Sequence, residues 1–252
     1  GGRIIGTLGL TFNNFSTKNM FKKGAWTPLP GGDGQKLSIR AQTNGKYYQG
    51  YNFSFTEPWL GGRKPNSLST WINHTALGNG YLKSNSLYTG IGITGVGAGI
   101  GRRKKWPDDY FSAYYELSYQ YYDVVKDNRF PIFPNGYAND IALKYTLQRS
   151  SISAPIYPQS GSNLSFSAKS TAPYSFFQKD VDYSALSAQE RYKYLEYYKI
   201  KLTGEWFFPL TTDKKLVLRT RVGFSFMGAY TALVLEPCTY SVLHYIQDLY
   251  ST

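Results

Sequence analysis

The chain has 252 residues, with 28 Lys and Arg against 16 Asp and Glu, and a single cysteine. That cysteine, Cys238, excludes an internal disulfide framework and a cysteine-based metal cluster. Aromatic residues make up 17% of the chain, although its mean hydropathy of −0.39 is in the range of soluble proteins. No run of about 18 apolar residues occurs, so the sequence excludes a helical membrane protein.

Apolar and polar residues alternate along most of the chain. In residues 36–44, for example, Lys36 and Arg40 have one parity and Ile39 has the other. Because successive side chains of a strand point to opposite faces, each such segment predicts a strand with one apolar and one polar face. Ten strands are expected, at residues 4–12, 36–44, 51–56, 68–76, 88–101, 111–121, 141–148, 164–169, 198–208 and 216–226.

Three local features add to this pattern. Within residues 88–101 the apolar positions change from odd (Ile91) to even (Val96), which predicts a β-bulge. The dipeptide at residues 44–45 is Asn-Gly and predicts a short hairpin turn. Ser187 and Glu190 form a capping box, which predicts a short helix inside the long link at residues 173–196.

The nature of the two faces separates a membrane barrel from a soluble sandwich, because both folds alternate. Aromatic residues gather near segment ends, as an interface girdle requires, and this favours the membrane barrel. The rings in question are Phe12, Tyr51, Trp59, Tyr121, Tyr122, Trp206, Phe207 and Phe208. A soluble sandwich or open sheet stays open as the alternative.

Cations dominate the polar positions and predict a basic lumen that tolerates anions. The positions are Lys36, Arg40, Lys144, Lys169, Lys199, Lys201, Arg219 and Arg221, with Glu116 and Glu205 as acidic counterparts. In a sandwich the same residues would be solvated outer positions.

Other chemical motifs are weak. The glycines at residues 90, 92 and 95 fit a dinucleotide fingerprint, but no helix pattern follows, so a glycine-rich strand is favoured. The basic run at residues 102–105 is best explained as a charged turn rather than a nucleic-acid site. The two histidines, His74 and His244, are too far apart in sequence to suggest a metal site. We therefore expect no enzyme activity, no cofactor and no nucleic-acid partner.

Three segments resemble a known family. The sequence Leu-Gly-Leu-Thr-Phe-Asn-Asn-Phe-Ser-Thr-Lys-Asn at residues 8–19 is similar to BamA-type outer-membrane assembly factors, in a form like that of Bacteroidetes. The segment at residues 54–69, which contains Glu57, Pro58 and Trp59, is similar to the same family. Tyr157 and Pro158, followed by Gly161, also resemble a turn of the family, with Gln-Ser in place of its usual middle residues.

The resemblance implies a sixteen-stranded transmembrane β-barrel of a Gram-negative outer membrane, preceded by periplasmic POTRA domains. Such proteins fold and insert other β-barrels by strand templating at a seam between the first and last strands. The implied partners are unfolded outer-membrane proteins, accessory lipoproteins, the lipid bilayer and lipopolysaccharide. A passive outer-membrane pore or transport channel is the alternative function.

The chain also departs from the family pattern. Residues 4–12 resemble the family's second strand, so the first strand, the POTRA domains, the Val-Arg-Gly-Phe loop motif and the last strands are not expected here. We therefore predict a partial barrel domain at residues 1–230, with ten strands, and a divergent tail at residues 231–252. The resemblance also places the link at residues 13–35 on the periplasmic side, as a contact for partner subunits.

Overall fold

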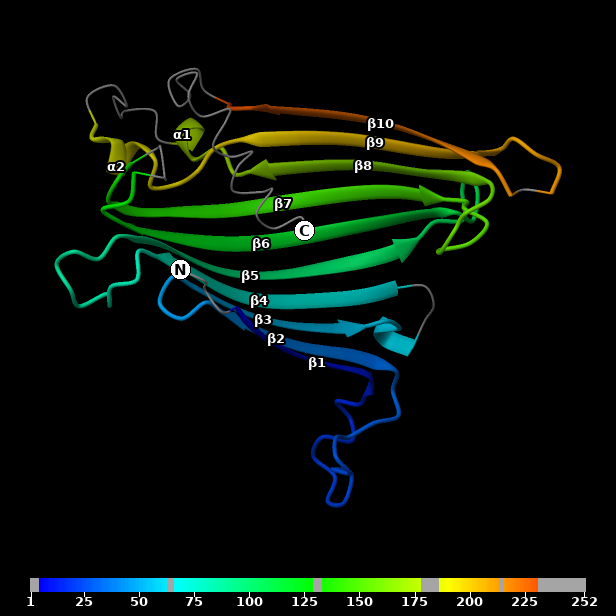
Figure 1. Cartoon of the computed structure of the whole chain (residues 1–252), viewed down its shortest axis with the longest axis horizontal. Coiled ribbons are helices and arrows are strands. Elements are labelled where there is room, and N and C mark those ends of the chain that lie inside the picture. Colours follow the sequence, from blue (N-terminus) through cyan, green and yellow to red (C-terminus); the bar gives the residue numbers. More distant parts are fainter. Residues whose placement is uncertain (1–4, 63–65, 129–132, 178–185, 214, 231–252) are drawn as a thin grey trace.

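The fold is one antiparallel sheet of ten strands in sequence order (Figure 1). A computed structural model describes residues 5–62, 66–128, 133–177, 186–213 and 215–230. The strands are β1 (Gly6–Phe15), β2 (Gln35–Thr43), β3 (Tyr48–Glu57), β4 (Asn66–Gly78), β5 (Gly90–Arg103), β6 (Phe111–Val125), β7 (Gly136–Ser150), β8 (Gly161–Thr171), β9 (Tyr198–Pro209) and β10 (Val217–Gly228). Each predicted segment overlaps one strand, which confirms the all-β antiparallel fold.

Helix is almost absent from the described residues. A 3₁₀ turn, η1 (Leu60–Gly62), and two short helices, α1 (Tyr174–Phe177) and α2 (Ala188–Arg191), lie in the links between strands. In the described part of the chain, no helix is long and apolar enough to cross a membrane. The expected capping box begins α2, where the amide of Glu190 donates to Ser187 Oγ at 3.3 Å. The residues of the predicted tail, 231–252, lie outside the described residues, and so does the part of the family motif at residues 63–65.

The pairing registers place most of the large apolar side chains of the ten strands on a single face, which we name the apolar face. One row across it shows the arrangement, because its members lie directly opposite one another on β1 to β7: Leu10, Ile39, Phe53, Ile72, Val96, Tyr119 and Ile141. Large apolar residues of this face are exposed, with Leu8 at 66% and Val222 at 62%. Its charged strand residues, Glu57, Arg102, Asp123 and Arg149, all lie at strand ends. A wide exposed apolar band with charges only at its margins is the surface that lipid requires.

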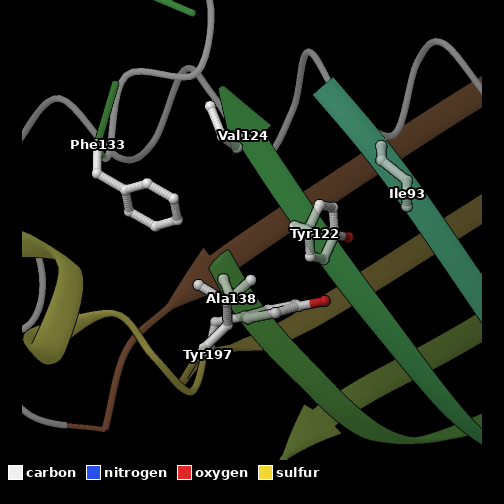
Figure 2. Packing of buried hydrophobic residues seen from close by; sticks show 7 residues of the cluster. Ile93, Tyr122, Val124, Phe133, Ala138 and Tyr197 are labelled. Carbon is white, nitrogen blue, oxygen red and sulfur yellow. The ribbon is translucent and has the colours of Figure 1, made fainter. Parts of the chain in front are cut away.

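The opposite face, the polar face, is covered at one end by the links between strands. Tyr122 and Val124 of β6 and Ile93 of β5 form a buried cluster there with Phe133 and Leu195, which come from two links; Ala138 and Tyr197 complete it (Figure 2). Strands β5 to β7 have 14, 15 and 15 residues, whereas a tilted strand needs only about 9–11 to cross a bilayer. The extra length of these strands supports the cluster beyond the apolar band.

The expected bulge in β5 is wrong. Both neighbours of β5 pair with it residue by residue over its whole length, without a register shift. Ile91 and Ile93 lie on the polar face, where Ile93 belongs to the buried cluster and Ile91 packs against it. The apolar parity changes because the polar face itself becomes apolar beneath the links. A register shift occurs instead in β1, between Phe12 and Phe15.

The expected aromatic girdle needs a similar correction. Tyr122 pairs with Ala138 and is only 5% exposed in the cluster, so it lies on the polar face. Phe207 also lies on the polar face, opposite Arg219. Both rings are sequence neighbours of aromatic residues on the apolar face, and adjacent residues of a strand must point in opposite directions.

Candidate functional site: the polar face and the turns that bound it

All eight cations expected on the polar side share the polar face. Lys36 and Arg40 have the same parity on β2 and therefore point to the same face. The registers place Lys144, Lys169, Lys199 and the arginines of β10 on that face as well. Glu116 and Glu205 lie on the same face, opposite Lys144 and Arg221 respectively. Whether this face lines the lumen of a closed barrel stays a prediction, because the ten strands form an open sheet.

Three lysines lie in one row across neighbouring strands. Lys144 of β7 is opposite Lys169 of β8, which is opposite Lys199 of β9. Like charges directly opposite one another destabilise a sheet, so this row needs compensation. Part of it comes from Asp140, whose Oδ2 accepts a hydrogen bond from Lys169 Nζ at 2.9 Å.

The Asp140–Lys169 pair is buried and joins the link between β8 and β9 to the sheet. The side chain of Asp140 is 1% exposed and that of Lys169 is 14% exposed. Tyr197, from the end of that link, donates to Asp140 Oδ2 at 2.9 Å and accepts from Lys169 Nζ. Burial, with the nearby Asp140 charge, raises the pKa of the Tyr197 phenol well above its ordinary value. Alternation alone did not identify this cluster, because Asp140 precedes the segment predicted as a strand.

Arginines on β10 form a second charged group on the polar face. Arg219 donates to Glu205 Oε1 at 2.7 Å, and Arg221 Nε lies 3.4 Å from the same oxygen. The Arg219 guanidinium also lies 5.9 Å from the ring centre of Phe207. Both arginines are more than half exposed, so this group remains open to solvent or to an anion.

The family-like residues at the strand ends have structural roles of different kinds. Glu57 Oε2 accepts a hydrogen bond from Gln35 Nε2 at 2.6 Å, and Glu57 Oε1 accepts from the amide of Trp59 at 3.0 Å. The Trp59 bond closes the turn that begins at Pro58, whereas the Gln35 bond joins Glu57 to β2. The sequence pointed to Glu57 through its motif, but its partner Gln35 carried no signal.

The second turn, between β7 and β8, is exposed at its tip. Tyr157 is 88% exposed and has a positive φ of 55°, and Pro158 follows it. Gly161 has a φ of 105°, and a Cβ there would collide with the backbone of Ser151. Glycine is therefore required at residue 161, whereas the Tyr157 side chain is exposed and Pro158 is half-buried.

The described residues offer little for metal chemistry. No group of three or more His, Cys, Asp or Glu within them is placed to hold a metal ion. His74 lies on the apolar face, where its Nδ1 is 2.8 Å from Thr94 Oγ1. The fingerprint glycine Gly95 and the next glycines of β5 lie in a strand paired on both sides, beneath the side chains of Trp71 and Tyr114.

These features define the class of the protein: a sheet with an apolar lipid-type face and a polar, basic face, as in an outer-membrane β-barrel. Residues 31–240 match the Omp85 superfamily domain. The chain therefore belongs to the Omp85 superfamily and is part of an outer-membrane protein. Comparison with curated protein sequences found no match.

A solved structure supports the fold. The chain is similar to the crystal structure of BamA from Haemophilus ducreyi lacking POTRA domains 1–3, with a TM-score of 0.58 and 19% sequence identity. The match covers 89% of this chain and 38% of that chain. The ten strands thus have the arrangement of a BamA barrel, and the chain spans well under half the length of that protein.

Proposed function

We propose that this chain is part of a BamA-type factor that folds and inserts other β-barrel proteins into the outer membrane of a Gram-negative bacterium. The observation that carries the proposal is the Omp85 match over residues 31–240, on a sheet whose two faces suit a barrel. The motifs around Glu57 and Tyr157 support the BamA type, in the form found in Bacteroidetes. The reaction is a change of fold, so no catalytic residue, cofactor or nucleic acid takes part.

The physical basis of the activity is strand pairing at an open edge. An unpaired edge presents a row of N–H and C=O groups on which an incoming strand can pair. The resemblance matches β1 to the second strand of the family, so it assigns the seam to strands beyond these ten. In this proposal β1 to β10 form the rigid wall of the barrel. Unfolded outer-membrane proteins are the substrates, and accessory lipoproteins and lipopolysaccharide are neighbours in the membrane.

Depletion of the full-length protein tests the proposal. Newly made β-barrel proteins should accumulate unfolded, and their heat-modifiable migration on gels should be lost while lipoprotein levels persist. Purified full-length protein in liposomes should also accelerate insertion of an unfolded barrel substrate. Normal insertion of other barrels after depletion would exclude the assembly function.

A passive anion-conducting pore is the second candidate, and the eight cations on the polar face favour it. Conductance of the full-length protein in planar bilayers separates the two. A steady open conductance with anion selectivity, together with no acceleration of insertion, would support the pore. Replacing Arg219 and Arg221 by glutamine would then reduce the anion preference.

A further inference from the structure

The link between β1 and β2, residues 16–34, is a folded unit that is fixed to the sheet. Ser16 is fully buried, and its Oγ donates to Asp33 Oδ2 at 2.6 Å. The Ser16 amide donates to the carbonyl of Pro30 at 2.8 Å. Asn14 Oδ1 accepts from the amides of Gly32 and Gly34, at 3.3 and 3.0 Å. We name this unit the β1–β2 loop.

The loop is attached on the side of the apolar face. Gln35 has the same parity as Leu37 and Ile39, so it lies at the margin of the apolar face, and it is only 3% exposed. It is covered by the loop, since the amide of Thr17 donates to Gln35 Oε1 at 2.8 Å and Gln35 Nε2 reaches Thr17 Oγ1 at 3.1 Å. Figure 1 shows the loop extending past β1, away from the other strands. The loop therefore begins where the apolar band ends, on the side that lipid surrounds.

The surface of the loop combines exposed rings with exposed lysines that outnumber its one acidic residue. Phe21 is 86% exposed and Trp26 is 54% exposed. Lys22 and Lys23 lie between the two rings in sequence and are exposed, and Lys18 is 82% exposed at 3.9 Å from Asp33. Three lysines and one aspartate give the loop a net charge of +2.

The indole of Trp26 is oriented by the loop itself. Its Nε1 donates to the carbonyl of Met20 at 3.0 Å. The polar atom of the ring is thus satisfied within the loop, and its carbon face is left outside. A ring held in this way can enter an apolar medium without burying an unpaired N–H.

We propose that the β1–β2 loop is a membrane-interface anchor, which inserts Phe21 and Trp26 into the phospholipid headgroup layer beside β1 and places Lys18, Lys22 and Lys23 against anionic lipid phosphates. Aromatic side chains favour this layer, and exposed lysines are attracted to its anionic surface. A protein partner would need an acidic surface for the same lysines, but lipid is already present at this margin of the apolar face. The inference goes beyond the proposed assembly function and does not depend on it.

The test uses nitroxide labels on full-length protein in nanodiscs. Cys238 and any other native cysteine of the full-length protein are replaced by serine, and a single cysteine replaces Phe21, whose side chain is exposed. The control label replaces Leu82, which is 60% exposed in the link between β4 and β5 at the opposite end of the sheet. Heat-modifiable migration checks that each labelled protein is folded. Power saturation then compares collision with apolar oxygen and with a polar nickel chelate.

The anchor predicts that the label at residue 21 collides severalfold more with oxygen than with nickel, relative to the label at residue 82. Adding phosphatidylglycerol to phosphatidylcholine should increase the inserted fraction. The double variant K22Q/K23Q should remove that increase, because each lysine lost should lower the insertion equilibrium constant about fivefold. The control variant K46Q, in the turn between β2 and β3, should leave the increase unchanged.

Two results would overturn the anchor. Equal collision ratios at residues 21 and 82 would place the loop in water. Exclusion of both oxygen and nickel from residue 21, in protein that retains accessory subunits, would show that a protein partner covers the loop instead. Because neither readout involves insertion of a substrate, the anchor and the assembly function can fail independently.

Discussion

The indole of Trp71 on β4 lies across the backbone of Gly97 on β5. The two residues are directly opposite in the register, and a Cβ at residue 97 would lie 2.5 Å from Cε2 of the ring. The alternating glycines of β5 are thus explained by packing: the polar face needs room there for the large side chains of its two neighbouring strands. Gly99 has the same relation to Tyr114 of β6.

Gly97→Ala should therefore destabilise the sheet. The added methyl group must displace the Trp71 ring, and overpacking of this kind costs about 1–3 kcal/mol of unfolding free energy. Urea unfolding in detergent, followed by heat-modifiable migration, measures the loss. The matched control is Gly223→Ala on β10, where a Cβ would meet nothing within 4 Å. Equal stability of the two variants would contradict this account of β5.

Asp140 and Lys169 should behave as a coupled buried pair. Removal of one partner leaves the other charge buried, so Asp140→Asn or Lys169→Met alone should lower the unfolding free energy by about 3–5 kcal/mol. The double variant should lose much less than the sum of the two. Lys215→Met, which removes an exposed pair with Asp213 at 3.5 Å, should change stability by less than about 1 kcal/mol. Additive losses at Asp140 and Lys169 would show that the two act independently.

The second carboxylate oxygen of Asp140 gives a further reason to expect a large loss of stability when this pair is broken. Asp140 Oδ1 is buried and has no hydrogen-bond partner among the described residues, so Asp140 depends on Lys169 and Tyr197 alone. A buried unsatisfied oxygen costs about 1–3 kcal/mol, which the pairing at Oδ2 must outweigh.

Tyr197 should make the same region sensitive to alkaline pH. Burial raises the pKa of its phenol in the folded protein well above the ordinary tyrosine value of about 10, which applies in the unfolded chain. The unfolded state therefore releases its proton first, and the stabilisation is fully present below about pH 10 and is lost as pH rises further. The stability difference between the wild type and Tyr197→Phe should thus shrink above pH 10. A difference that stays constant up to pH 12 would contradict this role of the phenol.

The alternation predicts the strands well because one rule, a lipid face against a water face, applies to all ten. The same rule fails wherever a third environment intrudes. Ile93 and Tyr122 lie on the polar face because links between strands cover that face at one end. No local sequence pattern predicts that links will cover a face. The cations of the polar face follow the rule, so Lys144, Lys169 and Lys199 could be expected to share it. Their row across three strands could not, because register depends on pairing partners that the sequence does not specify.

The contacts of the turns were the least predictable part of the site. Glu57 is recognisable from its motif, but Gln35 is 22 residues away and becomes its partner only when β2 and β3 pair. Asp140 could not be predicted as part of the site for a related reason: its partners Lys169 and Tyr197 come from β8 and from the link that follows β8. In both places the contacts join residues that are far apart in sequence and meet only when neighbouring strands pair.

The Gln35–Glu57 hydrogen bond should control how firmly the β1–β2 loop is held. Glu57→Ala removes a charged acceptor from a buried amide, and such a bond contributes about 1.5–3 kcal/mol. The loop should then open about 10 to 100 times more often, which exposes the backbone beside Lys18, Lys22 and Lys23 to trypsin. Limited proteolysis of the folded protein, with cleavage sites assigned by mass spectrometry, measures the rate. Asp213→Asn, in the exposed turn between β9 and β10, is the control and should leave cleavage in the β1–β2 loop unchanged. If Glu57→Ala left that rate unchanged as well, Ser16, Asn14 and Thr17 would be sufficient to hold the loop without Glu57.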